Sequence, residues 1–155
     1  MFDKNQVLIS SALVYKESKV GNKRWFLIQN EEGEWEFPKT PVRKVESSVR
    51  ASIRMIGEQG GMSIRVLEEA GRAGGVTTVG NKTVPIRYIY YIAMHLSDSG
   101  ESVGFKNSKW VADAKILRSL STKRDQLAFK QSRKVLRIWD RDKKEDIMAA
   151  EKSSV

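Results

Sequence analysis

The sequence predicts an α/β domain in which helices cover the faces of a mixed sheet. Several short segments concentrate β-branched and aromatic residues between polar turns, which is typical of strands. Residues 46–59 and 124–149 instead repeat apolar residues at helical spacing. The predicted order is strand, strand, helix, strand, hairpin, strand and helix, and this order favours a layered α/β arrangement.

Length and composition predict one folded domain, residues 1–155, with residues 146–155 as a frayed tail. The chain is 40% hydrophobic and 30% charged, which is ordinary for a globular protein and not for a disordered or membrane one. It contains no cysteine, which excludes a disulfide framework, a thiolate zinc site and a cysteine nucleophile. The single histidine, His95, leaves little for a histidine-based metal site.

The formal net charge is +9 at pH 7. A positive surface attracts anions such as nucleotide phosphates, nucleic acid or acidic lipid headgroups. Residues 1–15 lack the basic start and solid apolar run of a secretory signal, and no apolar run has the length of a membrane helix. We therefore expect a cytoplasmic protein whose partner is a nucleotide or another phosphate-bearing ligand. Nucleic acid is the alternative partner, no membrane partner is expected, and the oligomeric state stays open.

Strands are predicted where β-branched and aromatic residues cluster. The expected strands are residues 7–15, 24–29, 64–68, 76–79 and 84–96, with a last short strand at Trp110 and Val111, and residues 35–38 are expected as a short extended piece. Gly80 and Asn81 provide the backbone freedom of a tight turn, so residues 76–79 and 84–96 should form a hairpin. The glycines of residues 71–75 should loosen the chain before this hairpin, and residues 97–108 should form a surface loop.

Two helices are predicted from apolar periodicity. The first, residues 46–59, should turn Val49, Ile53 and Ile56 inward and end at Gly60 and Gly61, where a left-handed backbone costs little. The second, residues 124–149, has an apolar side formed by Phe129, Val135, Leu136 and Trp139. Its basic side comprises Lys130, Lys134, Arg137, Arg141 and Lys144. This side is either a solvated face or a track for phosphates.

Residues 40–62 follow the spacing of a known motif. The matching residues are Glu46, Arg54, Ile56, Glu58, Gly61 and Met62. They resemble the Nudix box, in which a Gly, five residues, a Glu and seven residues precede Arg-Glu, an aliphatic residue, any residue, Glu-Glu, any residue, Gly and an aliphatic residue. Residues 37–39 and 109–111 also resemble segments of Nudix proteins. The resemblance implies a Nudix-like α/β/α sandwich around a mixed sheet.

Three positions depart from the box. Thr40 stands at the opening glycine, Met55 at the glutamate after the arginine, and Gln59 at the second glutamate of the pair. The resemblance implies hydrolysis of a nucleoside diphosphate linked to another moiety, with Mg²⁺ or Mn²⁺ held by helix carboxylates. Hard divalent cations favour charged oxygens, and Met55 offers no proton acceptor. We therefore expect weak Mg²⁺ or Mn²⁺ binding at most, no other cofactor, and pyrophosphate hydrolysis that is weakened or lost.

Glu58 is the remaining helix acid of the box, so it is the candidate metal ligand and a candidate catalytic residue. Glu101 is the second catalytic candidate, because some Nudix proteins carry a further ligand or base upstream of the terminal strand; a solvated loop glutamate is the alternative. An active hydrolase with displaced acids is therefore a second hypothesis. In it, Glu101, Glu36 or Glu34 completes a site with Glu58.

Basic residues stand near the start of the box helix. Lys39, Arg43, Lys44 and Arg50 are expected around its N-terminus, which itself favours anions. We interpret these residues as a phosphate-binding set that replaces carboxylates and metal with fixed cations. A solvated basic loop is the alternative interpretation.

Glu46, Arg54 and Gly61 are assigned a structural role in the box. Arg54 and Glu58 are four residues apart on the predicted helix, and Glu46 lies two turns before Arg54, so the three side chains should form one ion-pair row. The retained pair and the lost acids together favour a nucleotide-binding protein with the Nudix fold over an enzyme. The remaining alternatives are an active hydrolase of nucleotide pyrophosphates and a basic RNA-binding or structural subunit.

Overall fold

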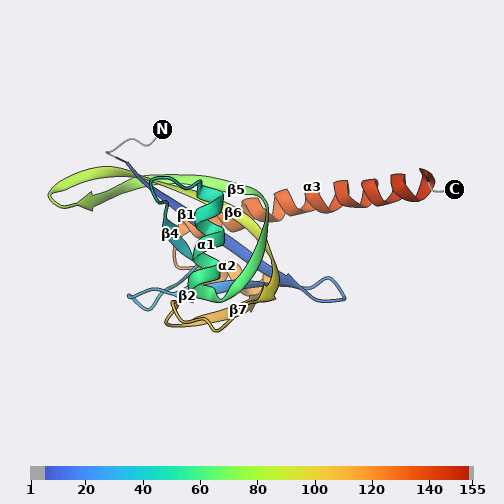
Figure 1. The fold of residues 1–155 in the computed structure, drawn as a ribbon, viewed down its shortest axis with the longest axis horizontal. Helices are drawn as coiled ribbons and strands as arrows, with labels where there is room; N and C mark the ends of the chain where they lie inside the picture. Colours follow the sequence, from blue (N-terminus) through green and yellow to red (C-terminus); the bar gives the residue numbers. More distant parts are fainter. Residues whose placement is uncertain (1–5, 154–155) are drawn as a thin grey trace.

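The computed structural model describes residues 6–153 and confirms the predicted α/β/α arrangement (Figure 1). The strands are β1 (Val7–Glu17), β2 (Lys23–Gln29), β3 (Trp35–Glu36), β4 (Lys39–Pro41), β5 (Met62–Val79), β6 (Lys82–Asp98) and β7 (Ser108–Ala112). The helices are α1 (Ser48–Gly60), α2 (Ile116–Ser119) and α3 (Lys123–Ser153), with a short 3₁₀ turn, η1 (Asp113–Lys115), before α2. The predicted single domain, residues 1–155, stays an expectation.

The strands form one mixed sheet in the order β3-β2-β1-β6-β5, with β4 paired to β1 and β7 paired to β2. β1 runs parallel to β6 and antiparallel to β2 and β4. Side chains on a strand alternate between its two faces, and β1 is buried on both. Side chains of β1 therefore contribute to two separate cores, one on each face of the sheet.

One core lies between the sheet and α1, and the other lies between the sheet and the α2–α3 segment. The first contains Ala12, Val14, Phe26, Met55 and Ile56. The second contains Leu13, Tyr15, Trp25, Phe129 and Leu136. Burial of each large apolar side chain stabilises the fold by about 1.5–3 kcal/mol relative to its exposure. The apolar side predicted for the last helix is confirmed in part, since Phe129 and Leu136 are buried and Val135 packs against the second core, but Trp139 belongs to neither core.

The predicted break at residues 71–75 is wrong, because β5 runs through it without interruption. Gly71, Gly74 and Gly75 pair with residues of β6, and irregularities in the register occur earlier, up to Glu69 and Gly71. The partner strand supplies hydrogen bonds along the whole segment, which outweighs the low strand preference of glycine. The hairpin turn is confirmed, with Gly80 at φ 63°.

The predicted inward face of α1 is only partly correct. Ile56 is fully buried, but Ile53 is 43% exposed. The residues of α1 that are buried are Ala51, Ser52, Met55, Ile56 and Gly60. Small side chains let the helix approach β1 closely, and the Oγ of Ser10 lies 2.6 Å from the Oγ of Ser52 and donates to the carbonyl of Ser48 at 2.6 Å. This contact rotates the helix away from the arrangement that apolar periodicity alone predicts.

α3 is longer than predicted. The helix continues to Ser153, so residues 146–153 are helical, and the fraying expected of residues 146–155 stays a prediction; residues 154–155 lie outside the described residues. Its basic side is exposed, as predicted. The distal part projects away from the sheet (Figure 1), and its Lys-, Glu- and Ala-rich sequence favours helix without packing. None of the helices in residues 6–153 has the length and apolar content required to cross a bilayer.

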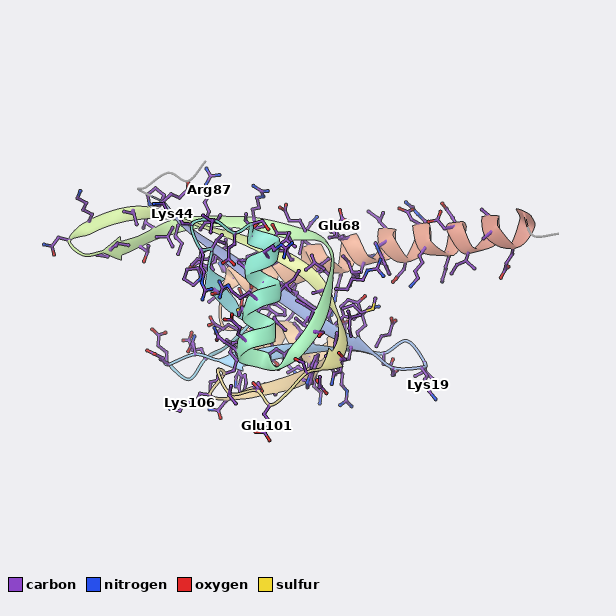
Figure 2. The ribbon with its side chains drawn as sticks, in the orientation of Figure 1. Lys19, Lys44, Glu68, Arg87, Glu101 and Lys106 are labelled. Carbon is purple, nitrogen blue, oxygen red and sulfur yellow. The ribbon has the colours of Figure 1, made fainter. Side chains whose placement is uncertain are left out.

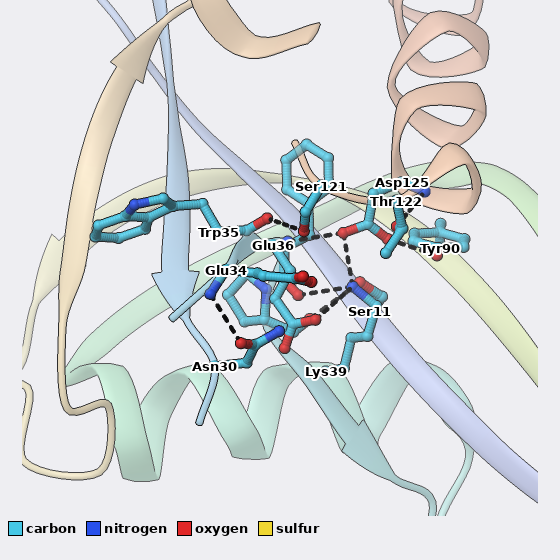
Figure 3. Close-up of polar contacts among 12 residues, drawn as sticks. Ser11, Asn30, Glu34, Trp35, Glu36, Lys39, Tyr90, Ser121, Thr122 and Asp125 are labelled. Carbon is cyan, nitrogen blue, oxygen red and sulfur yellow. Dashed lines mark hydrogen bonds and ion pairs between the residues drawn. The ribbon is translucent and has the colours of Figure 1, made fainter. Parts of the chain in front are cut away.

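The start of α3 is fixed to the sheet by Asp125, whose side chain is fully buried (Figure 3). Its Oδ2 accepts hydrogen bonds from the backbone N–H of Phe37 at 3.0 Å and from the Nζ of Lys39 at 2.8 Å. Its Oδ1 accepts from the hydroxyl of Tyr90 at 2.7 Å. Burial, followed by the charge of Asp125, raises the pKa of Tyr90, so the phenol keeps its proton and remains a donor. One carboxylate thus links β4, β6 and α3.

Replacing Asp125 with alanine should lower the free energy of unfolding by about 3 kcal/mol, because it removes the nearest counter-charge of the largely buried Lys39 ammonium and leaves only Glu36, 4.0 Å away. Urea denaturation followed by circular dichroism measures this change. The matched control is Asp142→Ala, since Asp142 is 61% exposed and lies 3.8 Å from Arg141; this control should leave the midpoint nearly unchanged. Equal effects of the two changes would contradict the role assigned to Asp125.

Candidate functional site

The loop before α1 is held against the helix by a paired carboxylate. Arg54 donates to both oxygens of Glu46, from Nη2 to Oε1 at 2.7 Å and from Nε to Oε2 at 3.0 Å. The backbone N–H of Arg43 also donates to Glu46, at 2.9 Å. The Oε2 of Glu58 lies 3.8 Å from the Nη1 of Arg54, so the predicted ion-pair row is present. It closes residues 43–46 onto the middle of α1.

The electrostatics of this clamp favour the charged form of Glu46. The hydrogen bond from Arg54, and next the backbone N–H of Arg43, lower the pKa of Glu46 to about 2. The carboxylate therefore stays charged far below neutral pH. Ser47 completes the start of the helix, because its side chain accepts from the backbone N–H of Arg50 at 3.1 Å.

The Glu46–Arg54 clamp should make stability depend on pH. A carboxyl group whose pKa is lowered by folding stabilises the fold fully at pH values above the ordinary pKa of glutamate. This stabilisation is lost as the pH falls through the folded-state pKa of about 2. The difference in unfolding free energy between the wild type and Glu46→Gln should therefore be largest near neutral pH and shrink in acid. Denaturation curves across this range measure it, with Glu31→Gln, in an exposed turn, as the control. A difference independent of pH would refute the assignment.

The side chains at the acid positions of the box do not fit a divalent cation. Met55 is fully buried in the apolar core beneath α1. The carbonyl of Gln59 accepts from the N–H of Gly104 at 3.1 Å and from the hydroxyl of Ser102 at 3.2 Å, so loop residues cover this end of the helix. Glu58 is the one carboxylate among the three positions, and residues 6–153 contain no group of three or more acidic or histidine side chains placed to hold a metal ion.

Of the three acids considered as replacements, Glu101 lies in the loop that contacts the C-terminal end of α1, whereas Glu36 and Glu34 lie elsewhere. Glu101 is exposed, and its side chain points into solvent (Figure 2). Glu36 lies on the α3 side of the sheet, 4.0 Å from the Nζ of Lys39, where burial raises the pKa of its carboxyl group. Glu34 is exposed in the β2–β3 turn.

Gly61 ends α1 in a conformation that only glycine adopts without strain. Its φ is 64°, and its N–H donates to the carbonyl of Gly57 at 3.2 Å. A Cβ atom at this position would lie 2.6 Å from the carbonyl oxygen of Gly100 and 2.8 Å from that of Glu101. The predicted stop is confirmed, and the glycine also admits the loop after β6 to the end of the helix.

Gly61→Ala should destabilise the protein by more than about 1 kcal/mol, because both the positive φ and the carbonyl of Gly100 oppose a side chain. Gly57→Ala is the matched control inside α1, where an added Cβ meets its nearest neighbour at an ordinary 3.9 Å. That control should stabilise the helix by about 0.5–1 kcal/mol. Thermal unfolding of the two variants measures effects of opposite sign, and the same sign for both would be inconsistent with this description.

The four predicted phosphate-binding cations do not lie together. Lys39 is directed to the α3 side of the sheet, where it contacts Asp125 and donates to the carbonyl of Phe37 at 3.0 Å. Its strand neighbour Thr40 is directed to the opposite side, because side chains alternate along β4. Arg43, Lys44 and Arg50 are exposed near the N-terminus of α1. Lys39 is therefore corrected to a structural ion-pair partner, and the other three remain candidates.

The fold adds Arg87 to this basic region. The N–H of Val42 donates to the carbonyl of Leu8 at 2.9 Å, and Leu8 is the register partner of Arg87 in β6. Two strand spacings place Val42 and Arg87 about 10 Å apart. Figure 2 shows Lys44 and Arg87 at the same end of the molecule, where the β5–β6 hairpin leaves the body.

Arg87 also faces the α1 side of the sheet. Tyr91, four residues later on the same face of β6, forms a short hydrogen bond with Ser48 in the first turn of α1. On β5, Gly74 lies opposite Arg87 in the register, and a glycine has no side chain that could cover the guanidinium. The absence of Asp and Glu from residues 70–97 was a sequence signal for a basic hairpin, but only the strand register assigns Arg87 to the start of α1.

Comparisons with known proteins agree with this architecture. No protein-family model and no curated protein matches the chain. Among solved structures, the Ap4A hydrolase of C. elegans in a binary complex superimposes with a TM-score of 0.64 and 18% identity, over 84% of this chain and 97% of that chain. The chain has the Nudix fold.

Two further structures with the Nudix fold are similar. The NUDIX domain of Shewanella oneidensis NrtR, complexed with ADP ribose, has a TM-score of 0.64 and 17% identity, over 86% of this chain and 90% of that chain. The MutT protein of Methanosarcina mazei Go1 has a TM-score of 0.63 and 20% identity, over 86% and 98%. At such low identity the likeness concerns the fold, so the chemistry of this Nudix-fold chain must be argued from its own side chains.

Proposed function

We propose that this Nudix-fold domain binds a nucleoside diphosphate or a related nucleotide through fixed cations at the N-terminus of α1. The proposal rests on Arg43, Lys44 and Arg50, which are exposed near the N-terminus of α1, and on Arg87, which lies at the same end of the molecule as Lys44 (Figure 2). The similar NrtR domain is complexed with ADP ribose, which supports a ligand that contains phosphate groups.

The start of α1 adds to the attraction for anions. Ser47 caps the N–H of Arg50, and the N–H groups of Ser48 and Val49 have no intrahelical carbonyl to bind. The helix dipole places a partial positive charge of about half an elementary charge at this end. Phosphate oxygens accept hydrogen bonds from such N–H groups and from arginine side chains. Because these charges are fixed, the proposed binding requires no bridging Mg²⁺ or Mn²⁺.

The side chains at the three acid positions of the box support the proposal that pyrophosphate hydrolysis is weakened or lost. Hydrolysis needs a base to activate water and ligands to hold a divalent cation. Met55 offers neither, Gln59 presents a neutral amide, and Glu58 is 59% exposed beside Arg54. The proposed activity is therefore binding of the nucleotide without efficient cleavage.

Calorimetric titration with ADP and ADP ribose tests the proposal, with either Mg²⁺ or EDTA present. We expect binding in both solutions. Lys44→Ala and Arg87→Ala should each weaken it by about tenfold, the effect of losing one hydrogen bond to a charged group. Lys19→Ala is the control because Lys19 lies in the β1–β2 turn, distant from α1 (Figure 2). Absence of binding, or binding that requires the metal, would overturn the proposal.

A phosphate-release assay with Mg²⁺ or Mn²⁺ distinguishes the active-hydrolase hypothesis. Cleavage that disappears in Glu58→Gln would show a working enzyme, whereas we expect no cleavage that depends on Glu58. A filter-binding assay addresses the RNA hypothesis. Tight RNA binding with a steep salt dependence, in a protein that does not bind nucleotides, would replace our proposal with an RNA-binding function.

A further inference from the structure

β5 is the last strand of the sheet, and the outer edge of its distal half is exposed. In the order β3-β2-β1-β6-β5, the described residues provide no strand on that side. β1 pairs with β6 only from Ile86 onward, so the hairpin tip extends beyond the sheet (Figure 1). Val76 is 72% exposed and Val79 is 55% exposed. Residues 73–79 therefore present unpaired backbone groups next to exposed apolar side chains.

This edge lacks the features that usually block strand pairing. Residues 73–79 read Ala-Gly-Gly-Val-Thr-Thr-Val and contain no charge and no proline. Natural proteins protect exposed edges with charged side chains, proline, bulges or very short strands. The register irregularities of β5 lie before this segment, up to Gly71, so the strand is regular where it is exposed.

We propose that β5 pairs antiparallel with the same strand of a second copy of this chain, so that residues 75–79 of the two copies lie opposite one another. A two-fold axis perpendicular to the sheet and centred on Thr77 keeps each side chain on its original face. Thr77 then lies opposite its own copy, and threonine pairs of this kind are favourable across strands. Gly74 and Gly75 contribute no side chains that would obstruct the approach.

The neutral edge is the place where a second copy meets the least electrostatic repulsion. Two chains of net charge +9 repel each other, and the repulsion is smallest where they meet through a neutral segment. Arg72 and Lys82 flank this segment and limit the pairing to the residues between them. The opposite end of the sheet is β3, a strand of only two residues, so the sheet offers no second long edge there. Pairing therefore closes at a dimer.

The proposed dimer is weak, and its association constant rises with salt concentration. A single strand edge falls below the roughly 1,200 Å² of interface typical of stable complexes, so the dimer forms reversibly and at high protein concentration. Salt screens the repulsion between the two positive chains and strengthens the dimer. A complex bridged by nucleic acid shows the opposite trend, because salt weakens contacts with phosphates.

Sedimentation equilibrium of the nuclease-treated protein, from micromolar to millimolar concentration and at low and high salt, tests the proposal. We expect a monomer–dimer equilibrium that salt strengthens. Val76→Lys should weaken the dimer by about tenfold or more, because it places two added charges at the paired edge. Val103→Lys is the matched control, since Val103 is another exposed valine and lies in the loop after β6. Circular dichroism verifies that both variants fold.

Three results would overturn the proposal. These are a monomer at every concentration, equal dimerisation of the two lysine variants, and an association that salt or nuclease abolishes. Nucleotide binding is measured separately on the Lys44 and Arg87 variants, which lie outside the paired segment. Failure of the dimer therefore leaves the proposed ligand site untouched, and failure of the ligand site leaves the dimer to be judged by sedimentation alone.

Discussion

The alternation of side chains along β1 determines where the candidate functional groups of this protein lie. β1 contacts β2, β4 and β6, and it is buried on both faces. Ser10 faces α1 and Ser11 faces α3, so their register partners Thr40 and Lys39 are directed to opposite layers. Arg87 shares the α1 layer because its partner is Leu8. A shift of one residue in this register would exchange the two sets.

This constraint also explains the contrast between the two polar regions. On the α3 side, Asp125 receives three hydrogen bonds and neutralises Lys39 within the protein. On the α1 side, Glu46 neutralises Arg54, while Arg43, Lys44, Arg50 and Arg87 remain exposed to solvent. A buried charge is stable only with its partner, whereas an exposed cation is available to an external anion. This contrast is the reason for proposing the ligand site on the α1 side.

Local sequence signals predicted the elements whose causes are local. The helix stop at Gly61, the turn at Gly80 and the buried face of α3 follow from backbone preference and apolar spacing. The Glu46–Arg54 pair was also predicted, since both residues belong to one motif. What failed depended on partners distant in the chain. Residues 71–75 form a strand paired with β6, and Ile53 is exposed on a helix that faces β1 with Ser52, which contacts Ser10.

In the candidate site, too, sequence reasoning failed for residues whose position depends on strand pairing. The sequence placed Lys39 near the start of α1 by proximity along the chain, but the direction of a strand side chain depends on its register. The pairing partner of Lys39, Asp125, lies far away in the sequence and gave no local signal. Arg87 was missed for the same reason. It lies near Val42 because β1 pairs in parallel with β6 and because the N–H of Val42 donates a hydrogen bond to the carbonyl of Leu8.

The long C-terminal helix has a consequence for motion. Its first half is anchored by Asp125, Phe129 and Leu136, and this anchored half provides the nucleus that an isolated helix must form at a cost. Residues 141–151 are exposed, and neither hydrophobic core includes any of them. Amide protons should therefore exchange with solvent at rates that rise along the helix, from opening of the whole domain near Phe129 to local fraying near the end. One continuous helix should thus exchange its amide protons by global unfolding in its first half and by local fraying in its second half.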